Sequence, residues 1–197
     1  MNTLNFYNQN SSDLISRYDN AEMSTLHKLF FKYFKSNCSV LDIGFGSGRD
    51  LAVLKENGYD IWGIDPSKEF VDNVQNRFSN ISNHFTQTSV PFQTKELPFN
   101  RKFDAIISIA MWMHLKHVDY MNIIKNIVSL ANSKSTIVIS YSKGTRSPDE
   151  RYFEDVDLKY LTHLFQKHNF SLVESTENTD SLNRDNLTWI TIVFKYD

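Results

Sequence analysis

The stretch Val40-Leu41-Asp42-Ile43-Gly44-Phe45-Gly46-Ser47-Gly48-Arg49-Asp50 decides the fold of this 197-residue chain. An apolar strand with an acid near its end leads into three glycines at alternate positions, and a helical pattern follows. Glycine reaches positive φ and lets the backbone pass close to a ligand. The stretch therefore predicts a strand, a tight turn and a helix N-terminus whose unpaired amides face a ligand above a sheet.

The spacing of the glycines bears on the kind of nucleotide that this turn would hold. A dinucleotide fingerprint has glycines at its first, third and sixth positions, whereas the sixth position counted from Gly44 is Arg49. Asp42 would lie badly beside a pyrophosphate and suits a ligand that carries an ammonium group. The stretch thus argues against NAD, and a plain strand–turn–helix without a ligand is the alternative.

A second acid strengthens the case for a ligand. Asp65 ends the next apolar run, 21 positions beyond Gly44, where a carboxylate can accept both hydroxyls of a ribose. Ligands of open α/β sheets bind outside the carboxyl ends of the strands. Ser108 to Met111 end a later apolar run and are expected to border the same crevice.

The rest of the chain alternates between strand and helix patterns. Apolar runs predict strands at 38–43, 59–65, within 84–97, and at 103–110, 135–141, 170–174 and 188–196. Helical spacing of apolar residues predicts helices at 21–35, 49–57, 67–78, 118–131 and 156–168. This order indicates an α/β fold: a doubly wound, seven-stranded, mostly parallel sheet with an antiparallel hairpin of the last two strands at its edge.

Composition sets limits on organisation and partners. The length suits a single domain over 1–197, with an N-terminal helical segment at 1–36 that covers the site and a core at 37–197. The net charge of −2 gives no sign of nucleic acid as a partner, and we find no signal peptide and no membrane-spanning run. Cys38 is the single cysteine, which favours a reducing cytoplasm. No metal site is predicted, and the sequence leaves the oligomeric state open.

The chain resembles the class I S-adenosylmethionine-dependent methyltransferases. The resemblance rests on LDIGFGSGRD and GIDPS, extends through LPFNRKFDAIISIAMWMHL, and includes a weaker match at 183–191 to a stand-alone bacterial subgroup. It implies a Rossmann-like fold, S-adenosylmethionine as cofactor and S-adenosylhomocysteine as product. Phe45 replaces a smaller residue of the family and is expected to narrow the space beside the cofactor. The family's turn before the fifth strand is replaced at 131–135, where we expect an altered loop far from the site.

The resemblance also implies roles for individual residues. Asp42 would hold the cofactor's amino group, and Arg49 is either the partner of its carboxylate or a solvated helix residue. Asp65 would bind the ribose, and Gln93 the adenine amino group, with Thr88 or Ser89 as the competing register. The remaining cofactor-binding candidates are Gly44, Phe45, Gly46, Gly48, Pro66, Ser67 and Ser108, and Tyr18, which is either a carboxylate ligand or a packing residue.

The methyl acceptor is the open question. Methyl transfer from a sulfonium needs a general base only where the nucleophile must lose a proton. His114 is the candidate base, although a capping or packing role would equally place a histidine there. Met111, Trp112 and Met113 line a substrate pocket or belong to the core. A basic loop and the C-terminal hairpin face an acidic substrate, RNA phosphate or only solvent, with the residues Lys143, Arg146, Arg151, Arg184 and Trp189. We predict a methyltransferase for a small molecule; the alternatives are an RNA or protein methyltransferase and a binding module without turnover.

Overall fold

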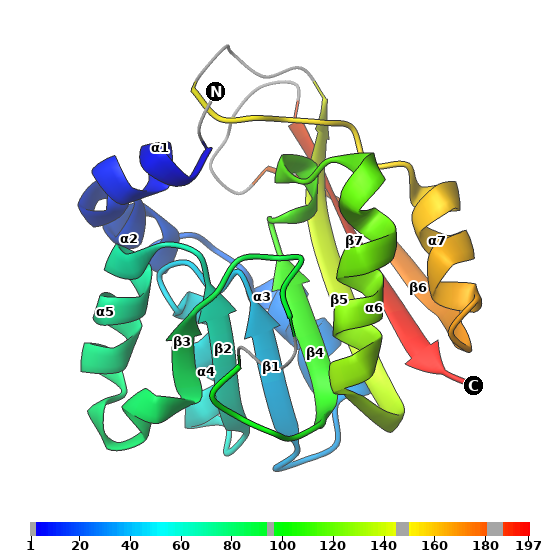
Figure 1. The fold of residues 1–197 in the computed structure, drawn as a ribbon, viewed down its shortest axis with the longest axis horizontal. Coiled ribbons are helices and arrows are strands. Elements are labelled where there is room, and N and C mark those ends of the chain that lie inside the picture. The colour runs from blue at the N-terminus through cyan, green and yellow to red at the C-terminus, as the bar shows by residue number, and fades with distance from the viewer. Residues whose placement is uncertain (1–2, 94–96, 145–149, 181–186) are drawn as a thin grey trace.

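A computed structural model describes residues 3–93, 97–144, 150–180 and 187–197. Its seven strands form one sheet in the order β3-β2-β1-β4-β5-β7-β6 (Figure 1). Strands β1 to β5 run parallel to one another, whereas β7 is antiparallel to both β5 and β6. The predicted fold class is therefore confirmed. The bounds are Ser39–Ile43, Asp60–Asp65, Phe85–Gln87, Phe103–Ile109, Ala131–Gly144, Phe170–Thr179 and Leu187–Tyr196 for β1 to β7.

Helices cover both faces of the sheet because successive strand residues point to opposite sides. Val40 packs with the face that carries α3, α4 and α5, while its neighbour Leu41 packs with the face of α6 and α7. The segment between β3 and β4 covers the latter face too, with Phe92 buried there. The helices span Thr3–Gln9, Ser11–Asp19, Ser24–Tyr33, Arg49–Glu56, Lys68–Arg77, Tyr120–Leu130 and Leu158–Gln166 for α1 to α7.

The chain departs from the sequence prediction before the fifth strand. Instead of a loop at 131–135, β5 begins at Ala131 and pairs with Phe103, and the register shifts before Thr136 pairs with Ala105. Lys134 takes up the irregularity with φ 73°. This irregularity lies at the amino end of β5, at the opposite end of the sheet from the glycine turn (Figure 1), so the expected distance from the site holds.

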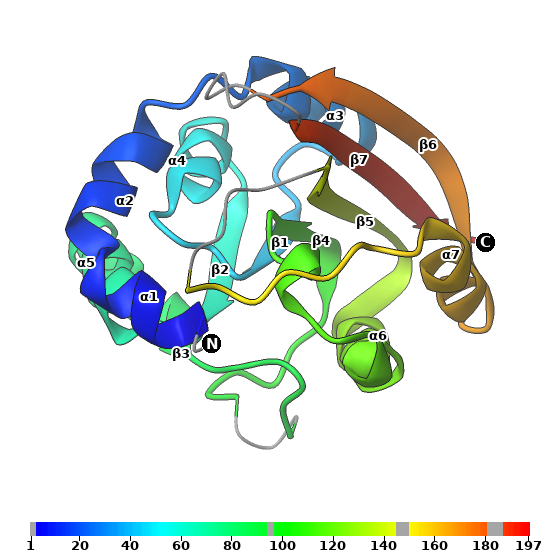
Figure 2. The same cartoon turned by 90° about the horizontal axis from the view of Figure 1, so that it is seen from above.

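Helices α1 and α2 lie beside α5, at the β3 side of the sheet and near the carboxyl ends of its strands (Figures 1 and 2). Figure 2 shows the segment after β5 passing the end of α1 before it reaches α7. A hydrogen bond joins the two, since the backbone amide of Tyr152 donates to Thr3 Oγ1 at 2.8 Å. Among the described helices, none has the length and apolar character needed to cross a membrane.

Candidate active site

The three glycines of the turn after β1 meet different requirements. All three have positive φ, at 83°, 55° and 80° for Gly44, Gly46 and Gly48. A Cβ on Gly48 would lie 2.7 Å from Val74 Cγ2, so this glycine is needed for the packing of α5 against the turn. A Cβ on Gly46 would meet only Tyr18 Cδ2, at 4.0 Å. Of the three glycines, Gly46 therefore has the most open space where a side chain would be, which would let a ligand approach its backbone closely.

Asp65 closes β2 and reaches back to this turn. Its carboxylate accepts the backbone amides of Gly46 at 2.9 Å and Ser67 at 2.8 Å. Burial raises its pKa to about 6, although the two amides act to lower it. A carboxylate has about four lone-pair positions, so two further hydroxyl donors can be accepted without breaking either bond.

Asp42 carries one of five buried side-chain polar atoms that have no hydrogen-bond partner among the described residues. Its side chain is 2% exposed, and its Oδ1 has no hydrogen-bond partner among the described residues. Burial and the negative charges of Asp50 and Asp65 raise its pKa well above the usual value, while Arg49 acts against the shift. Buried polar groups are normally hydrogen-bonded. The orphan oxygen therefore fits the amino group of a bound ligand.

Arg49 is engaged within the protein. Its Nε and Nη2 donate to the two carboxylate oxygens of Asp50 at 3.1 and 3.0 Å, and Nη1 donates to the Tyr18 carbonyl at 3.3 Å. Its side chain is 18% exposed, so the solvated alternative is wrong. His27 of α3 also bonds Asp50, with Nε2 and Oδ1 2.8 Å apart. Arg49 and Asp50 together link α2 and α3 to the start of α4, and we call this pair the brace.

Charge in this brace is balanced. Burial alone would raise the pKa of Asp50, but the charge of Arg49 and the hydrogen bonds from His27 and Arg49 outweigh it and lower the value to about 2. Asp50 is thus a structural acid beside the site. No role was predicted for Asp50 from the sequence, where its position directly after Arg49 was the available signal.

The adenine side of the site differs from the prediction in its register. Strand β3 ends at Gln87, so Thr88 and Ser89 follow the strand directly, whereas Gln93 lies six positions beyond its end and is exposed. The structure thus supports the competing register. Gln87 itself was missed: it pairs with Asp65 across the strands, and its Nε2 donates to the Pro66 carbonyl at 3.0 Å.

Two residues of the predicted cofactor set have side chains that pack into the core. The Phe45 ring lies edge-on to Phe85, with centroids 6.0 Å apart, and fills the space left by Gly63, where a Cβ would be 2.5 Å from Phe45 Cδ1. The expected narrowing beside the cofactor is therefore wrong, and only the backbone of Phe45 belongs to the turn. Ser67 is fully buried and caps α5, its Oγ accepting the Phe70 amide at 3.3 Å.

Residues after β4 border the turn from the other side. Met111 lies beside Gly44, because a Cβ added to Gly44 would be 3.2 Å from the Met111 Sδ. The Ser108 Oγ is 3.8 Å from the same sulfur. Trp112 and Met113 are 0% and 5% exposed and belong to the core. Of this apolar run, the structure thus brings only Met111 to the candidate site.

His114 lies between the N-terminal helix and the segment after β5. Its Nδ1 is 2.7 Å from the Tyr152 carbonyl, and its Nε2 is 2.9 Å from the Tyr7 hydroxyl. A carbonyl can only accept, so Nδ1 carries a proton, and in the neutral ring Nε2 accepts from Tyr7. Tyr7 was not predicted, because only the fold brings α1 to a residue 107 positions away.

The basic residues near this face are in different situations. The Arg151 guanidinium lies 4.8 Å from the Phe6 ring centroid and 5.0 Å from that of Phe153, so it is packed among aromatic rings. Lys143 is exposed, and Trp189 Nε1 donates to Asp180 Oδ1 at 2.6 Å. Arg146 and Arg184 lie outside the described residues.

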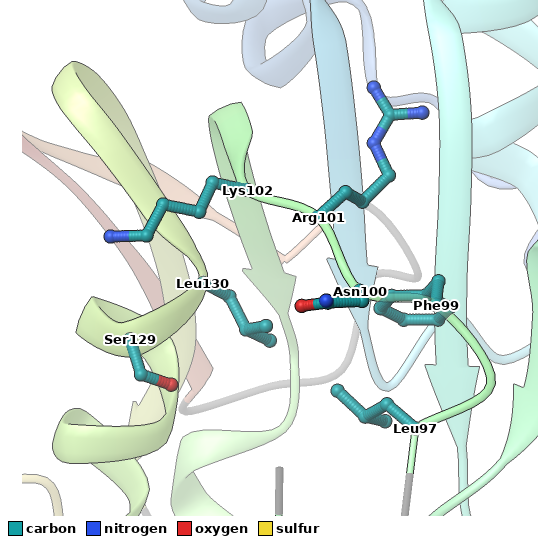
Figure 3. Close-up of a pocket in the computed structure, with 7 residues that line it drawn as sticks. All are labelled: Leu97, Phe99, Asn100, Arg101, Lys102, Ser129 and Leu130. Carbon is teal, nitrogen blue, oxygen red and sulfur yellow. The ribbon is translucent and has the colours of Figure 1, made fainter. Parts of the chain in front are cut away.

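A shallow hollow elsewhere lacks the features of an active site. Leu97, Phe99, Asn100, Arg101, Lys102, Ser129 and Leu130 line it (Figure 3). It lies where β4 begins, away from the carboxyl ends at which such sheets bind ligands. The charged groups of Arg101 and Lys102 point apart (Figure 3), and Arg101 Nη1 pairs with Asp60 at 3.0 Å. The glycine turn is therefore the candidate active site.

Comparison with known proteins identifies the family. A family model described as a methyltransferase domain matches residues 15–175, so the chain belongs to the methyltransferase-domain family. The predicted class, an S-adenosylmethionine-dependent methyltransferase of class I, is thereby confirmed. No curated protein matches the chain in sequence.

Solved structures show the same fold at low sequence identity. A Synechocystis magnesium protoporphyrin IX methyltransferase with bound S-adenosylhomocysteine is 14% identical, with a TM-score of 0.73 and 98% of each chain covered. A Burkholderia thailandensis 1,6-didemethyltoxoflavin methyltransferase is 17% identical, with a TM-score of 0.69 over 100% of this chain and 91% of the other. The putative methyltransferase of Haloferax volcanii, solved in complex with the Trm112 methyltransferase activator, is 12% identical, with a TM-score of 0.74 over 98% of this chain and 97% of the other.

Proposed function

We propose that this enzyme transfers a methyl group from S-adenosylmethionine to a small-molecule acceptor, and that the glycine turn holds the cofactor. The observation that carries the cofactor assignment is the buried Asp42, whose Oδ1 lacks a partner among the described residues. The bound cofactor supplies a methyl group already activated on a sulfonium. The protein's task is then to hold the acceptor in line with that methyl group.

The roles follow from the contacts around the turn. Asp42 accepts the amino group of the cofactor, and the backbone at Gly44, Gly46 and Gly48 faces its methionine part. Asp65 accepts the ribose hydroxyls with the lone pairs that its two amides leave over. Thr88 and Ser89 stand in the adenine register, in place of Gln93. Ser108, Pro66 and Ser67 complete the lining, and Tyr18, beside Gly46, covers it from α2.

A small acceptor is supported by what closes the site. Helices α1 and α2 flank the carboxyl ends of the strands on the β3 side (Figure 2), and α1 is hydrogen-bonded to the segment after β5. Arg151, the basic residue in the described part of that segment, is packed among rings and only partly exposed. The named substrates of two structural relatives are small molecules as well. Residues 1–36 would thus act as the cover of a single domain over 1–197, working in a reducing cytoplasm.

Two measurements test this proposal. Calorimetry should show that S-adenosylhomocysteine binds and NAD does not, and that Asp42→Ala weakens binding by about 1–3 kcal/mol, the penalty for unmade buried hydrogen bonds. Asp72→Ala, on the exposed side of α5, is the control. Preferential binding of NAD, or unchanged affinity in Asp42→Ala, would overturn the assignment.

The acceptor class needs a second experiment. The enzyme is incubated with methyl-labelled S-adenosylmethionine and separate small-molecule, RNA and protein fractions of a cell extract. We expect label in the small-molecule fraction, resistant to nuclease and protease. Label in RNA or protein would replace the small-molecule proposal. Cofactor binding with no label in any fraction would instead indicate a binding module without turnover.

A further inference from the structure

Tyr7 carries a part-buried hydroxyl that the proposed cofactor site does not use. Burial raises the pKa of Tyr7 above its usual value, so the phenol stays protonated. Tyr7 projects from α1, and its ring lies edge-on to the His114 ring, with centroids 5.7 Å apart. The same ring contacts Phe70 of α5 at 6.1 Å. The hydroxyl is thus held at a junction of three elements that surround the carboxyl end of the sheet.

The hydrogen bonds of Tyr7 have a definite direction. The Tyr152 carbonyl takes the proton of His114 Nδ1, which leaves Nε2 as an acceptor for the Tyr7 hydroxyl. Arg151 and Tyr18 are the other side-chain hydrogen-bond partners of Tyr7. Arg151 donates to the Tyr7 oxygen, because its hydrogen bond lowers the pKa of Tyr7, whereas the hydrogen bond with Tyr18 raises that pKa. The arrangement links a potential proton acceptor, His114, to an oxygen flanked by a cation.

We propose that Tyr7 and His114 form a proton relay that deprotonates the methyl acceptor, and that the acceptor atom is therefore a hydroxyl or an amine. The inference rests on the proposed methyltransferase function and adds the class of the nucleophile. The acceptor's O–H or N–H donates to a lone pair of the Tyr7 oxygen.

The step balances in atoms and charge. A lone pair of the acceptor forms the bond to the methyl carbon, and the carbon–sulfur bond breaks with its electrons remaining on sulfur. The acceptor's proton passes to the Tyr7 oxygen as the Tyr7 proton passes to His114 Nε2. The positive charge of the sulfonium thus ends on the imidazolium, whose Nδ1–H still donates to the Tyr152 carbonyl. Arg151 stabilises negative charge that develops on the Tyr7 oxygen during the transfer.

The test compares Tyr7→Phe and His114→Gln with Tyr160→Phe, a control on the remote helix α7. Single-turnover rates are measured with methyl-labelled S-adenosylmethionine and the small-molecule fraction. We expect each relay variant to lose about 100-fold or more, the usual range for acid–base catalysis. The double variant should lose no more than either single one, because the two groups act as a unit. Affinity for S-adenosylhomocysteine and the rate of Tyr160→Phe should stay within about twofold of wild type.

Solvent deuterium provides a readout that a packing role would not change. We expect a solvent isotope effect on the wild-type rate that shrinks in Tyr7→Phe, because the relayed proton is in flight during methyl transfer. A rate within about twofold of wild type in Tyr7→Phe overturns the relay. So does a lower rate with the isotope effect unchanged, which would assign Tyr7 to packing alone.

A spectroscopic arm keeps this test separate from the proposed function. Nitrogen-15 spectra of the wild type, with the His114 signals identified by their loss in His114→Gln, should show a neutral ring protonated on Nδ1 and accepting at Nε2. A proton on Nε2 instead would refute the relay even if an acceptor is found. Failure of S-adenosylhomocysteine to bind would refute the proposed function while leaving this tautomer result standing.

Discussion

Asp65→Asn measures the energetic consequence of burying a carboxyl at the site. Burial raises the pKa of Asp65 from 3.8 to about 6. At 1.36 kcal/mol per pKa unit, this change corresponds to about 3 kcal/mol. The side chain is 4% exposed, so solvent screens little of the effect. The two amides from Gly46 and Ser67 offset part of the burial and do not cancel it.

The sign of the effect follows from proton binding. The folded protein holds the Asp65 proton more tightly than the unfolded chain does. The stability contributed by this group is therefore fully present below pH 3.8 and is lost as the pH rises through about 6. Asparagine does not titrate. It can accept only one of the two backbone amide hydrogen bonds that Asp65 accepts, and this loss is the same at every pH. We expect the unfolding free energy of wild type minus that of Asp65→Asn to fall by about 3 kcal/mol between pH 3.8 and about 7.

Urea unfolding at a series of pH values measures this difference directly. Asp72→Asn, an exposed carboxyl of α5 that is paired with Lys68, is the control for removing one negative charge. A wild-type-minus-variant difference that stays constant across this pH range would refute the assignment of a raised pKa to Asp65. Saturating S-adenosylhomocysteine should flatten the difference, because ribose hydroxyls that donate to Asp65 favour its ionised form.

Three further changes test the packing and charge of the turn. Gly63→Ala places a Cβ against the Phe45 ring and should lower the unfolding free energy, measured by urea titration, by about 1–3 kcal/mol. Adding Phe45→Leu should restore part of this loss. Wild-type stability in Gly63→Ala alone would contradict the overlap. Asp50→Ala leaves the buried charge of Arg49 unpaired and should destabilise by about 3–5 kcal/mol, so a melting temperature equal to wild type would exclude the brace. Gly46→Ala places an alanine in the left-handed region, which costs about 1–2 kcal/mol of unfolding free energy. Calorimetry should show a tenfold or greater loss of affinity for S-adenosylhomocysteine. Unchanged affinity would show that the ligand does not bind close to Gly46.

The fold could be predicted from the sequence because the patterns that indicate it lie within short stretches of the chain. Gly44, Gly46 and Gly48 after an apolar strand, and Asp65 at the end of the next one, are patterns whose structural consequence needs no distant residue. The same holds for the hairpin of β6 and β7, two strand patterns with no helix between them. The short β3 gave the weakest signal, because three strand residues carry almost no alternation, and the choice between Gln93 and Thr88 or Ser89 for the adenine stayed open for that reason.

The parts that sequence reasoning missed depend on contacts between distant segments. Arg49 reads as a helix residue near a ligand until α2 and α3 bring a carbonyl and His27 to it. Phe45 reads as an obstruction until Gly63, on the neighbouring strand, is seen to receive its ring. The bond from Tyr7 to His114 joins residues 107 positions apart. No spacing rule reports such pairs.

The three buried acids near the turn show why a ligand cation belongs at one of them. Asp50 has Arg49 and His27, and its pKa falls to about 2. Asp65 has two backbone amides, which moderate the effect of burial but supply no full charge. Asp42 feels both of these acids, and only Arg49, already bonded to Asp50, opposes them. Because that guanidinium is committed to the brace, the ammonium group of the proposed cofactor, placed beside Gly44, would supply the positive charge that stabilises an ionised Asp42.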